Sequence, residues 1–311
     1  MAVTLFIPDF RQRFEAAGQP RLPYLERLVA RAVQRPAPSE MEFLAPIFGL
    51  EPDRFAPGPF MYLADSGTAD DAYRFCADFV HLAPDRDQLV LMPQPLLQAL
   101  PEELRALAAA FDSLYGAEGW KLELMASGRA YLHSPRPLDV TTSRPDAVAG
   151  QAVLDHMPRG EDAVQLKQLM NETQMLFHTH AVNRAREDAG RPLINSLWPW
   201  GGGSLPARVS ASPSPTVAGD LPLLHGIALW AGSEPEAVIP PAAAGECVLG
   251  SASMDPGAME RDWFAPLLAR LKCRDVEELV LYLGGMGLFT LDSGAAKRFW
   301  RRPRPLMAVP G

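Results

Sequence analysis

The chain has 311 residues, of which 48% are hydrophobic and 21% charged, typical of a folded protein with a large buried core. Its net charge of −8 argues against general nucleic-acid binding, since nucleic-acid-binding domains carry an excess of basic residues. No apolar run approaches the ~20 residues of a membrane helix, and we find neither a signal peptide nor a disulfide framework, so we expect a cytoplasmic protein.

Short apolar runs alternate with helical patterns along most of the chain. Val3–Ile7 predicts a buried strand, which Pro8 and Asp9 end. Further strands are expected at Phe60–Ala64, Arg74–Leu82, Gln88–Met92, Lys121–Ala126, Arg129–His133, Leu193–Trp198, Val238–Ile239, Cys247–Leu249, Glu278–Leu283 and Leu288–Leu291. Helices are expected at Leu22–Val33, Glu42–Phe48, Pro101–Tyr115, Asp162–Asp188, Leu221–Ala231, Met259–Lys272 and Ala295–Trp300.

This alternation predicts the fold class. Strands that alternate with helices favour an α/β protein with a largely parallel sheet and helices on both faces. Two hairpins are expected within this pattern, one across Ala83–Asp87 and one across Ser127 and Gly128. No linker divides the chain, so we expect a single α/β domain over residues 1–311.

The centre of the chain is the most specific part of the sequence, with NETQM (Asn171–Met175), HAVNRAR (His180–Arg186), INSLWPWGGG (Ile194–Gly203) and TVAGDLPLLHGIA (Thr216–Ala228). Three earlier segments fit the same pattern: LFIPD (Leu5–Asp9), PSE (Pro38–Glu40) and YRFCA (Tyr73–Ala77). Their order and spacing resemble the archaeal-type cofactor-independent phosphoglycerate mutases of the alkaline-phosphatase superfamily. Within that family the chain is most similar to a bacterial branch that includes RpfE-type regulatory proteins.

The resemblance implies a chemistry and its residues. Active members use two divalent cations to activate a serine that accepts and returns a phosphoryl group. Asp9 stands at the position of the first metal-binding aspartate, and Ser39 stands at that of the nucleophile. The neighbours differ, because Phe10 replaces the family's glycine and Glu40 replaces its aspartate.

The other metal ligands of the family are absent from the last third of the chain. They would be Asp-His pairs and a further histidine, but no histidine follows His225. We therefore expect most of the two-metal site to be missing, with Asp9 its only candidate metal ligand, and no bound cofactor. The alternative is two divalent ions, Mn or Zn, held by rearranged ligands.

Both catalytic candidates have a structural alternative. Asp9 could cap the turn after its strand, and Ser39 could begin a helix through a Ser-x-x-Glu capping box with Glu42. Candidates for ligand binding are Arg74, Asn195, Trp198, Trp200, Gly201, Gly203 and Asp220. The Trp198–Gly203 segment is expected to follow a strand parallel to the first one and to line a concave site near Asp9, with strand-loop packing as the alternative.

The predicted function is that of a catalytically degenerate phosphoglycerate-mutase-like protein with a regulatory or small-ligand-binding role. The alternative is an active metal-dependent phosphomutase or phosphatase for a small phosphorylated metabolite, so whether the chain is an enzyme stays open. The expected ligand is small and phosphorylated or acidic. The basic tail Lys297–Arg304 could bind a protein partner, or could be a solvated helix with Trp300 packed into the body.

Overall fold

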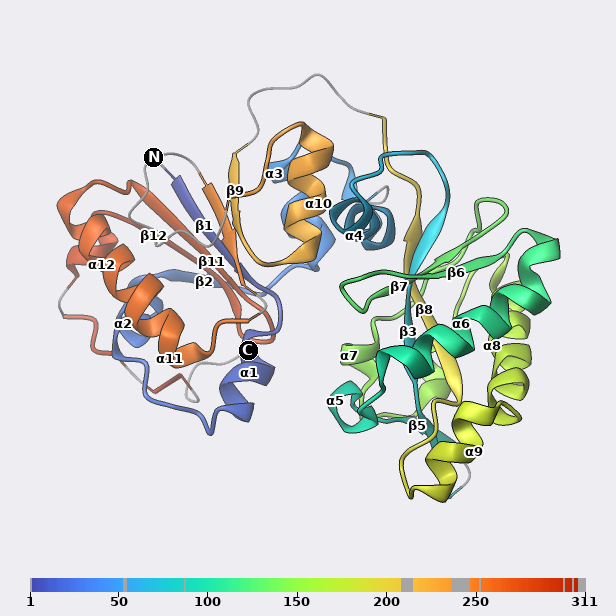
Figure 1. Ribbon diagram of the computed structural model, residues 1–311. Coiled ribbons are helices and arrows are strands. Elements are labelled where there is room, and N and C mark those ends of the chain that lie inside the picture. Colours follow the sequence, from blue (N-terminus) through green and yellow to red (C-terminus); the bar gives the residue numbers. More distant parts are fainter. Residues whose placement is uncertain are drawn as a thin grey trace. The chain divides into compact units, whose positions relative to one another are not determined.

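The computed structural model describes residues 2–52, 55–86, 88–207, 215–236, 247–251, 253–298, 300–303 and 305–306. It divides the chain into two compact units (Figure 1): the first comprises Met1–Asp53 and Arg208–Gly311, and the second is Arg54–Ala207. The expectation of a single α/β domain over residues 1–311 stays a prediction. The expected strand Val238–Ile239 lies outside the described residues.

The first unit is built on a six-stranded sheet in the order β2-β12-β11-β1-β10-β9. Four neighbouring strands are parallel: β11 (Glu278–Leu283), β1 (Ala2–Ile7), β10 (Cys247–Gly250) and β9 (Thr216–Gly219). At one edge β12 (Gly287–Asp292) and β2 (Val33–Arg35) add antiparallel pairs. The predicted α/β class with a largely parallel sheet is therefore confirmed.

Helices cover both faces of this sheet. The strand β1 presents apolar side chains to each face, and a helix layer buries each set. Val3, Leu5 and Ile7 belong to the core formed with α1 (Phe10–Ala16), α2 (Pro23–Arg31) and α12 (Ala265–Cys273). On the opposite face, Phe6 stacks on Phe43 of α3 (Glu40–Ile47), with ring centroids 5.9 Å apart. The remaining helical elements are α10 (Pro222–Ala231), α11 (Pro256–Met259), the π-helix Glu260–Phe264 and the 3-10 turn Ala295–Lys297.

The second unit holds a four-stranded antiparallel sheet in the order β6-β7-β3-β8. Its strands are β6 (Lys121–Leu124), β7 (Ala130–His133), β3 (Arg74–Val80) and β8 (Ser196–Gly203), with a separate hairpin of β4 (Leu82–Asp85) and β5 (Gln88–Leu91). The helical elements are α4 (Pro57–Ser66), α5 (Gln94–Leu97), α6 (Pro101–Tyr115), α7 (Pro145–Val148), α8 (Ala163–His178) and α9 (Ala181–Asp188), with 3-10 turns at Gly116–Glu118 and Val153–His156. No helix among the described residues is long and apolar enough to cross a membrane.

Three expectations about the second unit are wrong. Phe60–Ala64 is part of helix α4 and not a strand, because a short buried apolar run does not reveal its period. Asp162–Asp188 forms two helices, since His180 begins α9 by accepting the Val182 N–H at 3.2 Å. The segment Trp198–Gly203 continues strand β8, which pairs antiparallel with β3 and lies outside the sheet of β1.

Candidate functional site

The carboxyl ends of the parallel strands in the first unit meet at one edge, where α/β sheets usually bind ligands. Asp9 follows β1, Asp220 follows β9 and Ser251 follows β10. The strand pairs Phe6–Gly250 and Gly250–Gly219 align these three strand ends. The fold thus brings two of the predicted site residues, Asp9 and Asp220, to the same edge of the sheet.

A cation from the chain itself pairs with Asp9. Arg13, one turn along α1, donates through Nη2 to the Asp9 carboxylate and to the Ser251 carbonyl. Its Nη1 donates to the Met254 carbonyl at 3.1 Å. The side chains of Arg13 and Asp9 are 15% and 33% exposed, so this ion pair is partly shielded from water. The guanidinium therefore links the end of β1 to the turn after β10.

Asp220 takes part in the same turn. Its Oδ2 accepts the Ser253 N–H at 3.1 Å, and Ser251 Oγ accepts the N–H groups of Ser253 and Met254 at 3.2 and 3.0 Å. On α10, His225 places Nε2 2.6 Å from the Gly219 carbonyl oxygen. These polar side chains hold the backbone around the strand ends.

The residues at this edge do not fit a two-metal centre. Two such ions need several anionic oxygen ligands and usually imidazoles. Within the described part of the chain, no group of three or more His, Cys, Asp or Glu side chains is arranged to hold a metal ion. Asp9 and Asp220 are the carboxylates that immediately follow the strands here, and Asp9 already pairs with Arg13.

Ser39 adopts the capping geometry. It is exposed at the start of α3, where its Oγ accepts the Glu42 N–H at 3.2 Å. Glu42 Oε2 accepts the Ser39 N–H at 2.8 Å, and this bond lowers the pKa of the Glu42 carboxyl. The hydroxyl is therefore engaged in a complete capping box.

The two polar candidates at the ends of β3 and β8 serve the fold of the second unit. Arg74 is buried, donates to Asp70 at 2.6 Å and to His133 Nδ1 at 3.2 Å, and lies 3.9 Å from the centroid of the Tyr62 ring. Asn195 exchanges two hydrogen bonds with the backbone of Leu82, at 2.8 and 2.9 Å. Both side chains therefore have structural partners.

The tryptophans of β8 are also held by hydrogen bonds. Trp198 is buried and donates its indole N–H to the Ser143 carbonyl at 2.8 Å. Trp200 donates to Asp78 Oδ2 at 2.6 Å, and the Arg144 guanidinium lies 5.2 Å from its ring centroid.

The glycines of β8 allow close packing. A Cβ on Gly203 would lie 2.4 Å from the Cβ of Ala56, and Gly201 has a φ of +63° beside Pro57. The predicted alternative of strand packing accounts for both glycines. The structure places neither of them in the sheet of β1.

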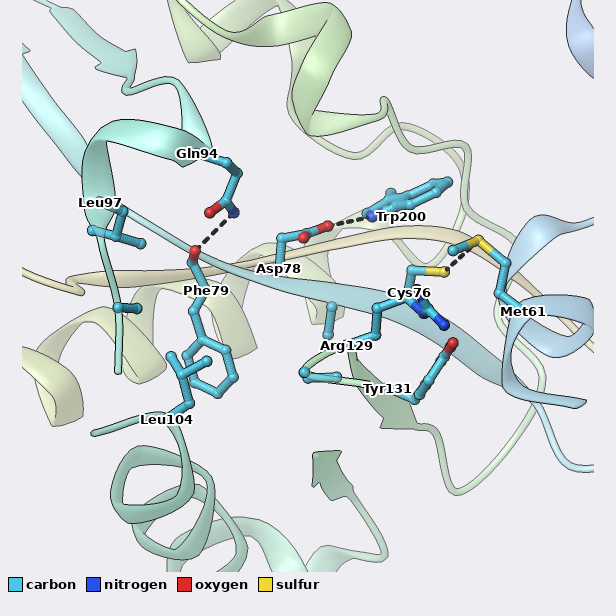
Figure 2. A pocket seen from close by; sticks show the side chains of 14 residues that line it. Met61, Cys76, Asp78, Phe79, Gln94, Leu97, Leu104, Arg129, Tyr131 and Trp200 are labelled. Atoms are coloured by element: carbon cyan, nitrogen blue, oxygen red, sulfur yellow. Dashed lines mark hydrogen bonds between the residues drawn. The ribbon is translucent and has the colours of Figure 1, made fainter. Parts of the chain in front are cut away.

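Sequence reasoning missed a pocket of about 180 Å³ beside β3 in the second unit (Figure 2). Its lining includes Cys76 and Asp78 of β3, Trp200 of β8 and Arg129 beside β7. Of these, only Trp200 was a predicted site residue. The signal available in the sequence was Asp78, a carboxylate inside the apolar run of β3.

Comparison with known proteins finds curated relatives that are named as 2,3-bisphosphoglycerate-independent phosphoglycerate mutases. No protein-family model matches the chain. A probable 2,3-bisphosphoglycerate-independent phosphoglycerate mutase of Geobacter sulfurreducens is 30% identical over 174 residues, which is 53% of this chain and 42% of that protein. A second enzyme of that name, from Methanothermobacter thermautotrophicus, is 27% identical over 144 residues, covering 45% and 33%. The chain thus spans less than half the length of these curated relatives.

Among solved structures, the cofactor-independent phosphoglycerate mutase of Thermoplasma acidophilum aligns with 94% of this chain and 90% of its own. The identity is 16% and the TM-score is 0.38.

Proposed function

Because the chain belongs to the family of cofactor-independent phosphoglycerate mutases, we propose that it is a catalytically degenerate member with a regulatory or ligand-binding role. The resemblance assigns Asp9 to the metal site of active members. In this chain Asp9 instead pairs with Arg13.

The Arg13 guanidinium is the observation that carries the proposal. It donates to the Asp9 carboxylate, which follows β1, and to the Ser251 and Met254 carbonyl groups, which follow β10. The guanidinium therefore lies beside Asp9, the one candidate metal ligand. A divalent ion about 4 Å from a guanidinium would be repelled by roughly 8 kcal/mol at an effective dielectric constant of 20. Two carboxylates at this edge offer little to offset that repulsion.

Phosphoryl transfer would also lack its nucleophile. A serine needs a metal ion or a base to activate it, and Ser39 is engaged in the capping box with Glu42. The alternative function, an active metal-dependent phosphomutase or phosphatase, is favoured by one observation, the shared sheet edge of Asp9 and Asp220.

The proposal includes what the protein binds. A small phosphorylated or acidic ligand follows from the resemblance, and a protein partner at the basic tail follows from Lys297–Arg304. Trp300 is 65% exposed, so its side chain is not buried as the alternative with Trp300 packed into the body expects. The described helical turn ends at Lys297, and Phe299 and Arg304 lie outside the described residues.

A mutase assay tests the proposal. Purified protein with excess Mn²⁺ and 3-phosphoglycerate should turn over at least 100-fold below about 1 s⁻¹, the low end of ordinary enzymes. A turnover of roughly 1 s⁻¹ or more that Asp9→Asn abolishes would refute it. Glu15→Gln, which removes an exposed charge from the same helix α1, is the matched control.

A further inference from the structure

The pocket beside β3 exists because β7 stops short of the end of its partner. The register of β3 and β7 runs from Arg74 to Cys76 and ends there. Beyond it, Gln94 of α5 donates to the Phe79 carbonyl at 2.8 Å, in place of a neighbouring strand (Figure 2). The lining residues are Met61, Cys76, Ala77, Asp78, Phe79, Gln94, Leu97, Ala99, Leu104, Gly128, Arg129, Ala130, Tyr131 and Trp200.

The size of the pocket limits its occupant. Its volume is about 180 Å³. An apolar cavity of ~150 Å³ holds benzene, so a ligand of about six to ten non-hydrogen atoms fits. Met61 and Leu97 line the pocket and supply apolar surface for the body of such a ligand.

One carboxylate in the pocket, Asp78, forms no ion pair with a described residue. Asp78 Oδ2 accepts the Trp200 N–H at 2.6 Å, whereas Oδ1 accepts no hydrogen bond from any described residue. Burial raises the pKa of this carboxyl, and the Trp200 N–H and the Arg144 guanidinium offset only part of the effect. Arg144 forms its ion pair with Asp146 at 2.9 Å, and the charge of Asp146 also raises the pKa of Asp78. A cation near Oδ1 would stabilise the ionised form.

The cation that lines the pocket is already neutralised. Arg129 donates through Nε to Asp65 Oδ2 at 2.8 Å and through Nη2 to Oδ1. Tyr131 donates to the same carboxylate at 2.7 Å. Arg129 Nη1 has no hydrogen bond within the described part of the chain, so an anion is the competing occupant, but Asp78 would repel it.

Cys76 does not make the pocket a reactive site. Its Sγ lies 3.6 Å from Met61 Sδ, and burial raises the pKa of the thiol well above its usual value. The thiolate is the nucleophilic form of cysteine, so this side chain stays a thiol at neutral pH. The pocket is therefore suited to binding and not to covalent chemistry.

We propose that this pocket binds a small amphiphilic cation, a primary ammonium group on an apolar body, with the ammonium at Asp78 Oδ1 and the body against Met61 and Leu97. The inference involves the second unit alone. It stands whether or not the strand ends of the first unit hold metal ions.

Calorimetric titration with three matched probes tests the proposal. Benzylamine should bind the protein at neutral pH about tenfold or more tightly than benzyl alcohol, its uncharged analogue, and benzoate, its anionic one. Asp78→Asn should weaken benzylamine binding by about tenfold or more. Asp85→Asn removes an exposed carboxylate from the same unit and should leave it unchanged.

A second variant keeps the test decisive if Asp78→Asn does not fold by circular dichroism. Ala99→Phe fills the pocket and leaves the carboxylate in place, so it should abolish benzylamine binding. The proposal is overturned if benzoate binds as tightly as benzylamine, if a folded Asp78→Asn or Ala99→Phe binds normally, or if benzylamine does not bind at millimolar concentration. Metal content and turnover do not enter these readouts, so failure here is distinct from failure of the proposed function.

Discussion

Arg186 shows how the fold uses arginines that a sequence presents as possible phosphate ligands. Its side chain is buried and donates to the Pro192 carbonyl and to Glu103 Oε2, both at 2.6 Å, and also to the Leu97 carbonyl. It thereby ties α9 to α5 and α6. Arg13 and Arg74 are likewise held by carboxylates and backbone or ring partners.

Replacing Arg186 should be costly. Arg186→Ala leaves two carbonyl groups without this donor, whereas Glu103 keeps Arg191 and the Leu100 N–H as partners. Since an unsatisfied buried polar group costs about 1–3 kcal/mol, a loss of roughly 2–4 kcal/mol is expected. Urea denaturation should show that loss in the free energy of unfolding. Arg184→Ala, two residues away on the exposed side of α9, should change it by less than about 0.5 kcal/mol. Equal effects in the two variants would contradict the structural role of Arg186.

Sequence reasoning named Arg74 as a candidate ligand-binding residue, but it could not identify the partners of any of these arginines. A phosphate and a carboxylate present similar oxygens to a guanidinium, so the residue type does not separate the two roles. The partners come from distant parts of the chain: Arg13 donates to the Ser251 carbonyl, and Arg186 donates to Glu103. Only the tertiary structure brings them together.

At the scale of the element, helix α3 separates the two interpretations of Ser39. Ser39→Ala removes the cap and should lower the free energy of unfolding by about 0.5–2 kcal/mol. Ser39→Asp keeps an oxygen acceptor at the N-cap and should retain most of the stability. Thermal denaturation followed by circular dichroism measures both. An alanine variant as stable as the parent would show that the capping box contributes nothing.

Helix α2 begins with a cap supplied from elsewhere in the chain. Glu260, buried in the π-helix, accepts the N–H groups of Tyr24 and Leu25 at 2.5 and 3.1 Å. Burial raises the pKa of the Glu260 carboxyl, and these bonds offset only part of that effect. The folded state therefore holds this proton more tightly than the unfolded chain does.

The sign of the resulting pH dependence is fixed. The contribution of Glu260 is fully present below the ordinary glutamate pKa of about 4.3 and is lost as the pH rises through its higher folded pKa. The unfolding free energy of the parent minus that of Glu260→Gln should therefore fall between acidic and neutral pH. Urea denaturation at several pH values measures it, with Glu15→Gln as the exposed control. A difference that rises with pH would contradict this assignment.

The glycines of β8 explain why this element was predicted as a strand followed by a loop. A Cβ on Gly202 would lie 2.2 Å from the Phe75 ring, so only glycine fits where the strand packs. The apolar alternation that predicted the strand ends where side chains give way to glycines. A run of glycines suggests a loop when the neighbours that exclude side chains are unknown.

At the scale of the whole molecule, the sequence predicted the fold class and the resemblance to a known family. It did not predict that the chain divides into two compact units. Alternating strands and helices predicted the parallel sheet of the first unit, and the motif order pointed to the mutase family. The antiparallel sheet of the second unit was not expected, because hairpins such as β6–β7 do not reveal which strands they join. Its pocket depends on where the pairing of β3 with β7 stops, which no local pattern specifies.

The central claim is that the strand ends of the first unit no longer form a two-metal centre. Elemental analysis of protein purified without chelator, in medium supplied with Mn and Zn, tests it most directly. We predict well below one divalent metal ion per chain, because Arg13 pairs with Asp9 and no group of three or more metal-ligating side chains occurs among the residues that the structure describes. About two ions per chain, as a two-metal mechanism requires, that are lost in Asp9→Asn would contradict the account.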